Sequence, residues 1–324
     1  MIFRRNTILG GFYLSQLCVG VIGNSLLFMM YVYSFLVKSH FSKPIDPIFM
    51  HLMIVNVLTI IFAMISHIMS SFGVPRFLDD VGCKAVLYIF RVTRGLSICT
   101  TSILSAFQAI TIMPSNSKWA WLKPKLSTWT FRAFLLSWLI NLFIYAQIVE
   151  TVAAKINYTD LDYGYSHAYC KMRPPEYPNP GLFLSLIIIG DIVFLTLMMW
   201  TSLYMVTLLY RHRKRAQHLH SSSLSCQPSP ERKATHSILL MVSVFVFVYL
   251  LHNFITLCGF YAQTKLPRLE VINVILTTCY PTICPFLLMK NNKLIFHFPS
   301  YYYCCIHICV YTYVHAAINI DTIC

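Results

Sequence analysis

The sequence predicts an all-α membrane protein, folded as a bundle of seven transmembrane helices. Of its 324 residues, 57% are hydrophobic and only 11% are charged, whereas a soluble domain carries roughly 25% charged residues. The apolar residues fall in long runs, each about the 20 residues that a helix needs to cross the hydrocarbon of a bilayer. Short polar segments separate these runs, as expected for loops between membrane spans.

Seven runs are long enough to span. The first, Ile8 to Val37, is too long for a signal-peptide core and no small-residue cleavage site closes it, so we expect an uncleaved span. The other spans are predicted at residues 47–72, 83–111, 129–149, 181–210, 237–261 and 271–289. An odd number of spans places the two termini on opposite sides of the membrane.

Two signals predict an extracellular N-terminus. With that orientation, the cytoplasmic segments carry more Lys and Arg than the outer ones, as membrane topology favours. The sequon at Asn157, the only one in the chain, then falls in an outer loop, and glycans are added only on the lumenal side. The chain has 25 basic and 11 acidic residues, and because the basic ones lie in short loops we attribute the excess to topology rather than to a nucleic-acid partner.

The third span is the one around which we expect the others to pack. It carries Arg91 and Arg94 about 12 and 17 Å beyond Cys83 along the helix axis, where a charge against lipid costs several kcal/mol. A polar row continues along the same helical face, at Arg91, Arg94, Ser97, Thr101, Ser105 and Gln108. A helix with such a row is predicted to lie at the centre of a bundle.

We identify Arg91, Arg94 and Asp191 as candidate ligand-binding residues. Asp191 in the fifth span lies within about one helical turn of the depth of the two arginines, and a buried carboxylate is costly unless it is paired. We expect it to pair with Arg94, leaving Arg91 nearer the mouth of the bundle for ligand. The alternatives are that both arginines are purely structural, or that Asp191 itself contacts ligand.

The cysteines predict one structural bond and no metal site. Twelve are scattered without a zinc-type spacing, and no enzyme or cofactor-binding motif is found. Cys83 and Cys170 both lie on the oxidising outer side. A disulfide between them would hold the outer loop over the mouth of the bundle, and two free thiols are the alternative.

Four stretches are more specific. They read RGLSICTTSILSAFQAIT from Arg94, SNSKWAWLKPKLS from Ser115, LYRHRKRAQHLHSSSLS from Leu209 and KATHSILLMVS from Lys233. Together they resemble the vomeronasal type-1 receptor family over roughly Leu9 to Lys293. The resemblance implies a chemosensory G-protein-coupled receptor of the plasma membrane, which binds a small pheromone-like ligand in the outer bundle. It also implies an inhibitory-class heterotrimeric G protein at the inner face, near Arg211, Arg213, Lys214, Arg215, Arg232 and Lys233.

General rhodopsin-like motifs are weak or missing. Phe107-Gln108-Ala109 stands where the larger family has Asp-Arg-Tyr, Tyr280 to Cys284 replaces Asn-Pro-x-x-Tyr, and Asn56 replaces an Asp that commonly binds sodium. Bitter-taste receptors are the nearest alternative, although their third-span motif is not present. A transporter with buried charges is a further alternative, but no internal repeat supports it.

We divide the chain into a receptor domain, residues 1–293, and an atypical low-complexity cytoplasmic tail, residues 294–324. The tail alternates Tyr, Val, Thr, Cys, Ile and His as translated dinucleotide repeats would. Our hypothesis is read-through past a damaged ancestral stop codon, and a non-signalling relic is therefore an alternative to a working receptor. Palmitoylation at Cys304 and Cys305 is the alternative interpretation.

Overall fold

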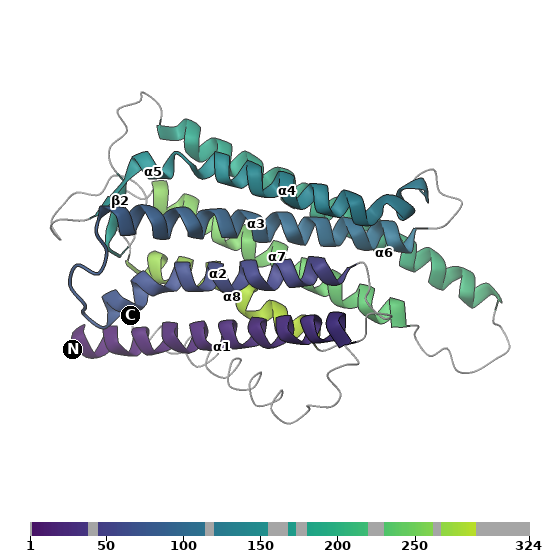
Figure 1. The fold of residues 1–324 in the computed structure, drawn as a ribbon, viewed down its shortest axis with the longest axis horizontal. Coiled ribbons are helices and arrows are strands. Elements are labelled where there is room, and N and C mark those ends of the chain that lie inside the picture. The colour runs from purple at the N-terminus through teal and green to yellow at the C-terminus, as the bar shows by residue number, and fades with distance from the viewer. Residues whose placement is uncertain are drawn as a thin grey trace.

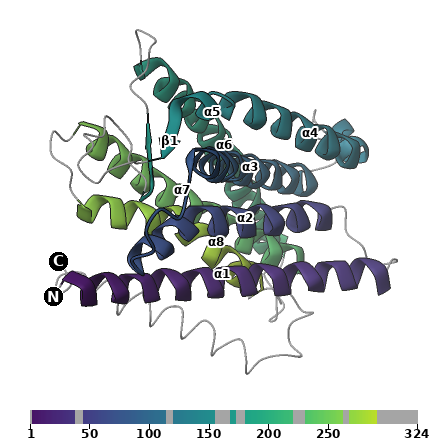
Figure 2. The ribbon, with the colours of Figure 1, turned by 60° about the vertical axis from the view of Figure 1, so that its left-hand side comes forward.

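The computed structural model describes residues 2–37, 45–113, 120–154, 168–172, 180–219, 230–261 and 267–289. Within these residues, seven long helices run side by side in a bundle (Figures 1 and 2). They are α1 (Ile2–Val37), α2 (Asp46–Ser71), α3 (Asp80–Ile112), α4 (Leu126–Tyr145), α6 (Pro180–Leu219), α7 (Pro230–Tyr261) and α8 (Pro267–Met289). The shorter elements are η2 (Ala120–Lys125), α5 (Ile148–Thr151), β1 (Val152–Ala154) and β2 (Cys170–Met172). Asn157 and the tail from residue 290 lie outside the described residues.

The seven predicted spans correspond to these seven helices. Six are long and apolar enough to cross a membrane, and α6 adds an apolar stretch, Ile192–Leu208, among the side chains that the structure describes. Large apolar side chains are exposed on the outside of the bundle, for example Phe143 at 85% and Trp200 at 74%. In a bilayer these side chains face lipid, so their exposure is what a membrane protein requires.

The prediction for the segment between the fifth and sixth spans was wrong in part. We expected a solvated loop over residues 211–236, but α6 continues to Leu219 and α7 begins at Pro230. Arg and Lys are good helix formers, so the basic run can extend the helix beyond the hydrocarbon. The predicted cytoplasmic residues therefore lie on two helical extensions rather than in a loop.

Helix α3 is central, as predicted. Ser97, Thr101 and Ser105 of its polar row are at most 3% exposed, and the helix contacts α2, α4, α6 and α7. His51 of α2 ties two neighbours together, because its Nδ1 lies 2.9 Å from Thr100 Oγ1 and its Nε2 accepts a hydrogen bond from Trp138 Nε1 at 3.0 Å. His51 is therefore an interhelical hydrogen-bonding residue.

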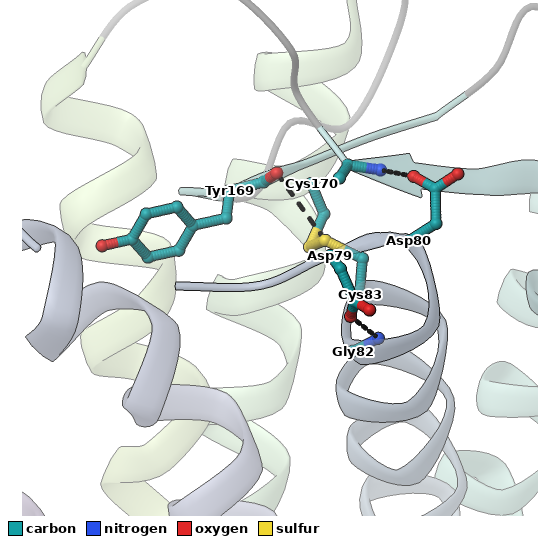
Figure 3. Close-up of a disulfide and its surroundings, with 7 residues drawn as sticks. Asp79, Asp80, Gly82, Cys83, Tyr169 and Cys170 are labelled. Carbon is teal, nitrogen blue, oxygen red and sulfur yellow. Dashed lines mark hydrogen bonds between the residues drawn. A yellow bond between two sulfur atoms is a disulfide. The ribbon is translucent and has the colours of Figure 1, made fainter. Parts of the chain in front are cut away.

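A short hairpin covers the outer end of α3. Strands β1 and β2 pair antiparallel with Ala154 opposite Cys170, and Cys170 forms a disulfide with Cys83 in the first turn of α3 (Figure 3). This confirms the predicted bond. The hairpin itself was not predicted from the sequence.

Two hydrogen bonds hold the hairpin at further points. Asp80 Oδ1 accepts from the backbone N–H of Ala154 at 2.7 Å, and the Tyr169 hydroxyl donates to the carbonyl of Val74 at 2.6 Å. Asp79 caps α3 by accepting from the N–H of Gly82 at 2.7 Å. The outer loop is thus fixed to α3 and to the α2–α3 turn, so its described residues form a rigid cover.

A close helix approach occurs at Gly95, where α3 meets α4. A Cβ atom at this position would collide with the amide oxygen of Asn141 and lie 2.9 Å from its Cγ and 3.2 Å from Tyr145 Cε2.

We expect Gly95→Ala to lower stability by about 1–3 kcal/mol through overpacking, measured by thermal unfolding of the purified receptor. Adding Asn141→Ala should recover part of the loss. Gly11→Ala is the control, because nothing lies within 4 Å of the new Cβ; equal melting temperatures for the two alanine variants would contradict the prediction.

The disulfide gives a second prediction. We expect Cys83→Ser to destabilise the outer loop by about 2–4 kcal/mol and to reduce delivery to the cell surface. Surface antibody staining measures delivery, and a membrane-impermeant maleimide should newly label Cys170. Cys18→Ser, which changes an exposed free thiol of α1, is the control. If Cys83→Ser matches the parent in both assays, the bond does not form in cells.

Candidate functional site

A small cavity lies between α2, α3, α7 and α8, with a volume of about 30 Å³, enough for about one or two water molecules. Its polar lining consists of Thr59, Arg94, Ser97, His252, Thr277 and Tyr280, and its apolar and aromatic lining of Ile98, Phe245, Val248, Tyr249, Leu276 and Pro281. None of these described lining residues is acidic. The cavity therefore combines one permanent cation with hydroxyl groups and an aromatic wall.

Arg94 borders the cavity from α3. Its guanidinium carbon lies 5.0 Å from the centre of the Tyr249 ring of α7, within the range of a cation–π interaction, and its Nη2 atom is buried. The guanidinium of Arg91 instead lies 5.8 Å from the ring centre of the adjacent Phe90, and Arg91 is not among the lining residues. We expected Arg91 to lie nearer the mouth of the bundle for ligand, and of the two arginines it is Arg94 that lines this cavity.

His252 faces the same cavity from α7 and is 5% exposed. Its Nδ1 lies 3.1 Å from the Thr277 hydroxyl, and that hydroxyl donates to the carbonyl of Asn273 at 2.8 Å. The pair joins α7 to α8 at the wall of the cavity.

The cavity floor continues into a neutral hydrogen-bonded network across four helices. Ser97 Oγ donates to Asn56 Oδ1 at 3.0 Å, and Asn56 Nδ2 donates to Asn24 Oδ1 at 3.4 Å. Asn24 Nδ2 donates in turn to the carbonyl of Pro281 at 2.9 Å, while Tyr280 lies 3.1 Å from Thr101 Oγ1, oxygen to oxygen. The network thus joins α1, α2, α3 and α8 directly below the cavity.

The register of α6 against α3 is set by two contacts. Ser102 Oγ donates to the carbonyl of Phe194 at 3.3 Å, and Ser105 Oγ lies 2.6 Å from Thr201 Oγ1. Asp191 stands one turn before this contact on α6, but its side chain lies outside the described residues. Its pairing with Arg94 stays a prediction.

The predicted cytoplasmic residues fall at the inner ends of α6 and α7. Arg211 is exposed on α6. The side chains of Arg213, Lys214, Arg215, Arg232 and Lys233 lie outside the described part of the chain. Their helical positions place them at the end of the bundle opposite the disulfide (Figure 1).

Sequence reasoning missed Tyr249, His252 and Thr277. One signal was available, because His252 is a lone ionisable residue inside an apolar span, a pattern that indicates a functional position. The aromatic partner of Arg94 carried no such signal, since Tyr249 is one of 20 tyrosines.

Known proteins resemble the chain in sequence and in fold. The model of the vomeronasal organ pheromone receptor family matches residues 7–300. Human vomeronasal type-1 receptor 4 is 35% identical over 288 residues, covering 89% of this chain and 95% of that receptor. Rat vomeronasal type-1 receptor 94 is 34% identical over 295 residues, covering 91% and 88%. The crystal structure of squid rhodopsin matches the fold with a TM-score of 0.70 at 13% identity, covering 94% and 83%. The chain therefore belongs to the vomeronasal type-1 receptor family, a group of multi-pass plasma-membrane receptors with the G-protein-coupled receptor fold.

Proposed function

We propose that this chemosensory receptor binds a small pheromone-like ligand through Arg94, in the cavity below the outer hairpin, and signals to an inhibitory-class G protein. The observation that carries the proposal is the placement of Arg94 on the cavity wall beside Tyr249 and His252. Intramembrane ionisable residues that face a cavity generally mark a ligand or ion pathway. Membership of the family supports the receptor role, and the finer assignment rests on these side chains.

The lining indicates what the ligand offers. Arg94 supplies the one guanidinium among the described lining side chains, so the ligand group that complements it is an anion or a strong hydrogen-bond acceptor. A carboxylate can accept two parallel hydrogen bonds from arginine, which strengthens and orients the contact. Phe245, Tyr249 and Leu276 provide the apolar surface for the body of the ligand.

The cavity has to enlarge for binding. Its volume of about 30 Å³ is far below the roughly 300–1,000 Å³ of small-molecule sites. A ligand group that binds Arg94 competes with the Tyr249 ring for the guanidinium, so binding separates α3 from α7 at this point. The contact between Arg94 and Tyr249 is thus present in the ligand-free receptor and is broken when ligand binds.

The polar network offers a route from the cavity toward the inner face. Ser97 and Tyr280 both line the cavity and bond to groups below it, Asn56 and Thr101 respectively. A shift of α3 relative to α2 must therefore exchange the Ser97–Asn56 bond, and a shift relative to α8 must exchange the Thr101–Tyr280 bond. We assign the G-protein contact to the inner extensions of α6 and α7, where the basic residues from Arg211 onward gather.

Of the alternatives, the family match disfavours a transporter or a bitter-taste receptor, because both belong to other families. The non-signalling relic remains a second candidate, favoured by the dinucleotide-repeat pattern after residue 293. The transcript downstream of Lys293 tests read-through, and delivery of the protein to the cell surface tests the relic. A non-repetitive coding tail in near relatives would exclude read-through.

The ligand assignment predicts a difference between the two arginines. We expect Arg94→Gln to weaken responses to aryl carboxylic acids about 10- to 100-fold, since a hydrogen bond to a charged group contributes about 1.5–3 kcal/mol. Arg91→Gln, the matched control, should change them less than about threefold because Arg91 lies off the cavity wall. The readout is second-messenger concentration in cells with equal surface expression, and the methyl esters of the same acids should lose potency on the parent. Equal potency of acids and esters, or equal effects of the two substitutions, would exclude Arg94 as the anion contact.

The G-protein assignment predicts that replacing Arg211, Arg213, Lys214 and Arg215 with Gln lowers signalling while ligand binding persists. The physical reason is the loss of a basic docking surface at the end of α6. Pertussis toxin, which blocks inhibitory-class G proteins, should remove the parent response. Glycosylation at Asn157 is the topology control: if it is lost in the variant, the four residues act by orienting the chain, and the docking assignment is wrong.

A further inference from the structure

A basic and aromatic patch lies where the chain turns from α3 into α4, at the inner end of the bundle. This η2–α4 patch consists of Trp121, Lys123, Lys125, Trp129 and Arg132. Trp121 and Trp129 are 53% and 52% exposed, and Lys125 Nζ lies 5.6 Å from the ring centre of Trp121. Neither η2 nor α4 contains an acidic residue, so the patch has no compensating charge on its own elements.

The patch faces lipid rather than the aqueous cytoplasm. Lys125, Trp129 and Arg132 are spaced by four and three residues, which puts them on one helical face. Arg132 stands about 10 Å along the axis from Lys125, on a helix whose neighbouring Phe131 and Leu135 are 64% and 51% exposed. In a bilayer an exposed arginine among such residues extends along the helix until its guanidinium reaches the level of the lipid phosphates.

The start of α4 lies within the same positive field. No side chain caps its first turn, where the N-cap residue is Lys125, and η2 ends at that same residue. The cations of the patch therefore favour an anion at this end of α4. Tryptophan side chains prefer the membrane–water interface, so Trp121 and Trp129 set this level of the protein at the headgroups.

We propose that the η2–α4 patch is a binding site for the headgroup of an anionic phospholipid of the inner leaflet. Lys125 and Arg132 bracket its phosphate, Lys123 contributes to the surrounding positive field, and the two tryptophans pack against the glycerol and upper acyl chains. A soluble protein partner fits less well, because Arg132 lies beyond the first turn of a lipid-facing helix, where an aqueous partner does not reach. The bound lipid would fix the turn between α3 and α4.

The experiment compares receptor in nanodiscs of phosphatidylcholine alone with receptor in nanodiscs that also contain phosphatidylserine. We expect phosphatidylserine to raise the melting temperature of the parent, and to be retained in preference to phosphatidylcholine when native mass spectrometry counts the lipids left after extraction. The retention ratio is measured on the parent protein, so the test does not depend on any variant folding. Equal retention of the two lipids would overturn the proposal.

The variant K125Q/R132Q should lose most of the preference for phosphatidylserine, with about fivefold weaker retention for each cation removed. The matched control is R76Q/K84Q, which removes two positive charges from the outer side. Because both leaflets of a nanodisc have the same composition, unspecific attraction would affect the two variants equally, and that result would overturn the proposal. The proposal would also be overturned if K125Q/R132Q lowered G-protein activation in phosphatidylcholine alone while its lipid retention stayed at the parent level. In that case the patch would contact the G protein.

Discussion

A polar side chain inside the hydrocarbon has no water to bind, and this constraint organises the bundle. Ser97, Thr101 and Ser105 of α3 meet it by bonding to Asn56, Tyr280 and Thr201, each on a different helix. Interhelical hydrogen bonds in membrane proteins contribute only about 0.6 kcal/mol each on average. Their larger effect is on register, because sliding α3 by one turn would break all three at once. The polar row thus determines which faces of α2, α6 and α8 turn inward.

The prolines of α8 show the same constraint on the backbone. Pro281 and Pro285 lie inside the helix, and each leaves a carbonyl of the preceding turn without its usual donor. Prolines are tolerated in membrane helices because neighbouring groups satisfy the freed backbone. The carbonyl of Pro281 itself accepts from Asn24 of α1. The irregular part of α8 is therefore held by α1 and lies directly beneath the cavity.

Much of this architecture could be predicted because it follows from hydrophobicity and spacing along the chain. The seven spans and the central position of α3 depend on local patterns, and the Cys83–Cys170 bond follows from the topology that those spans imply. The length of α6 could not be predicted in the same way, because the end of an apolar run marks the membrane surface and a helix can continue beyond it. Likewise β1 and β2, three residues each, are held by the disulfide and by Asp80 rather than by strand propensity.

The choice between Arg91 and Arg94 shows where sequence reasoning reaches its limit. A spacing of three puts both arginines on one helical face, and only the residues packed against that face distinguish them. Arg94 meets Tyr249 and the cavity, whereas Arg91 lies against Phe90 of its own helix. The deciding contact joins residues far apart in the sequence, and no local pattern encodes it. Because the network beneath is built from amides and hydroxyls, Arg94 supplies the only permanent charge among the described lining residues. If ligand binds at Arg94 as proposed, an anionic group acts on this one charge, whereas a neutral ligand acts through shape and hydrogen bonds.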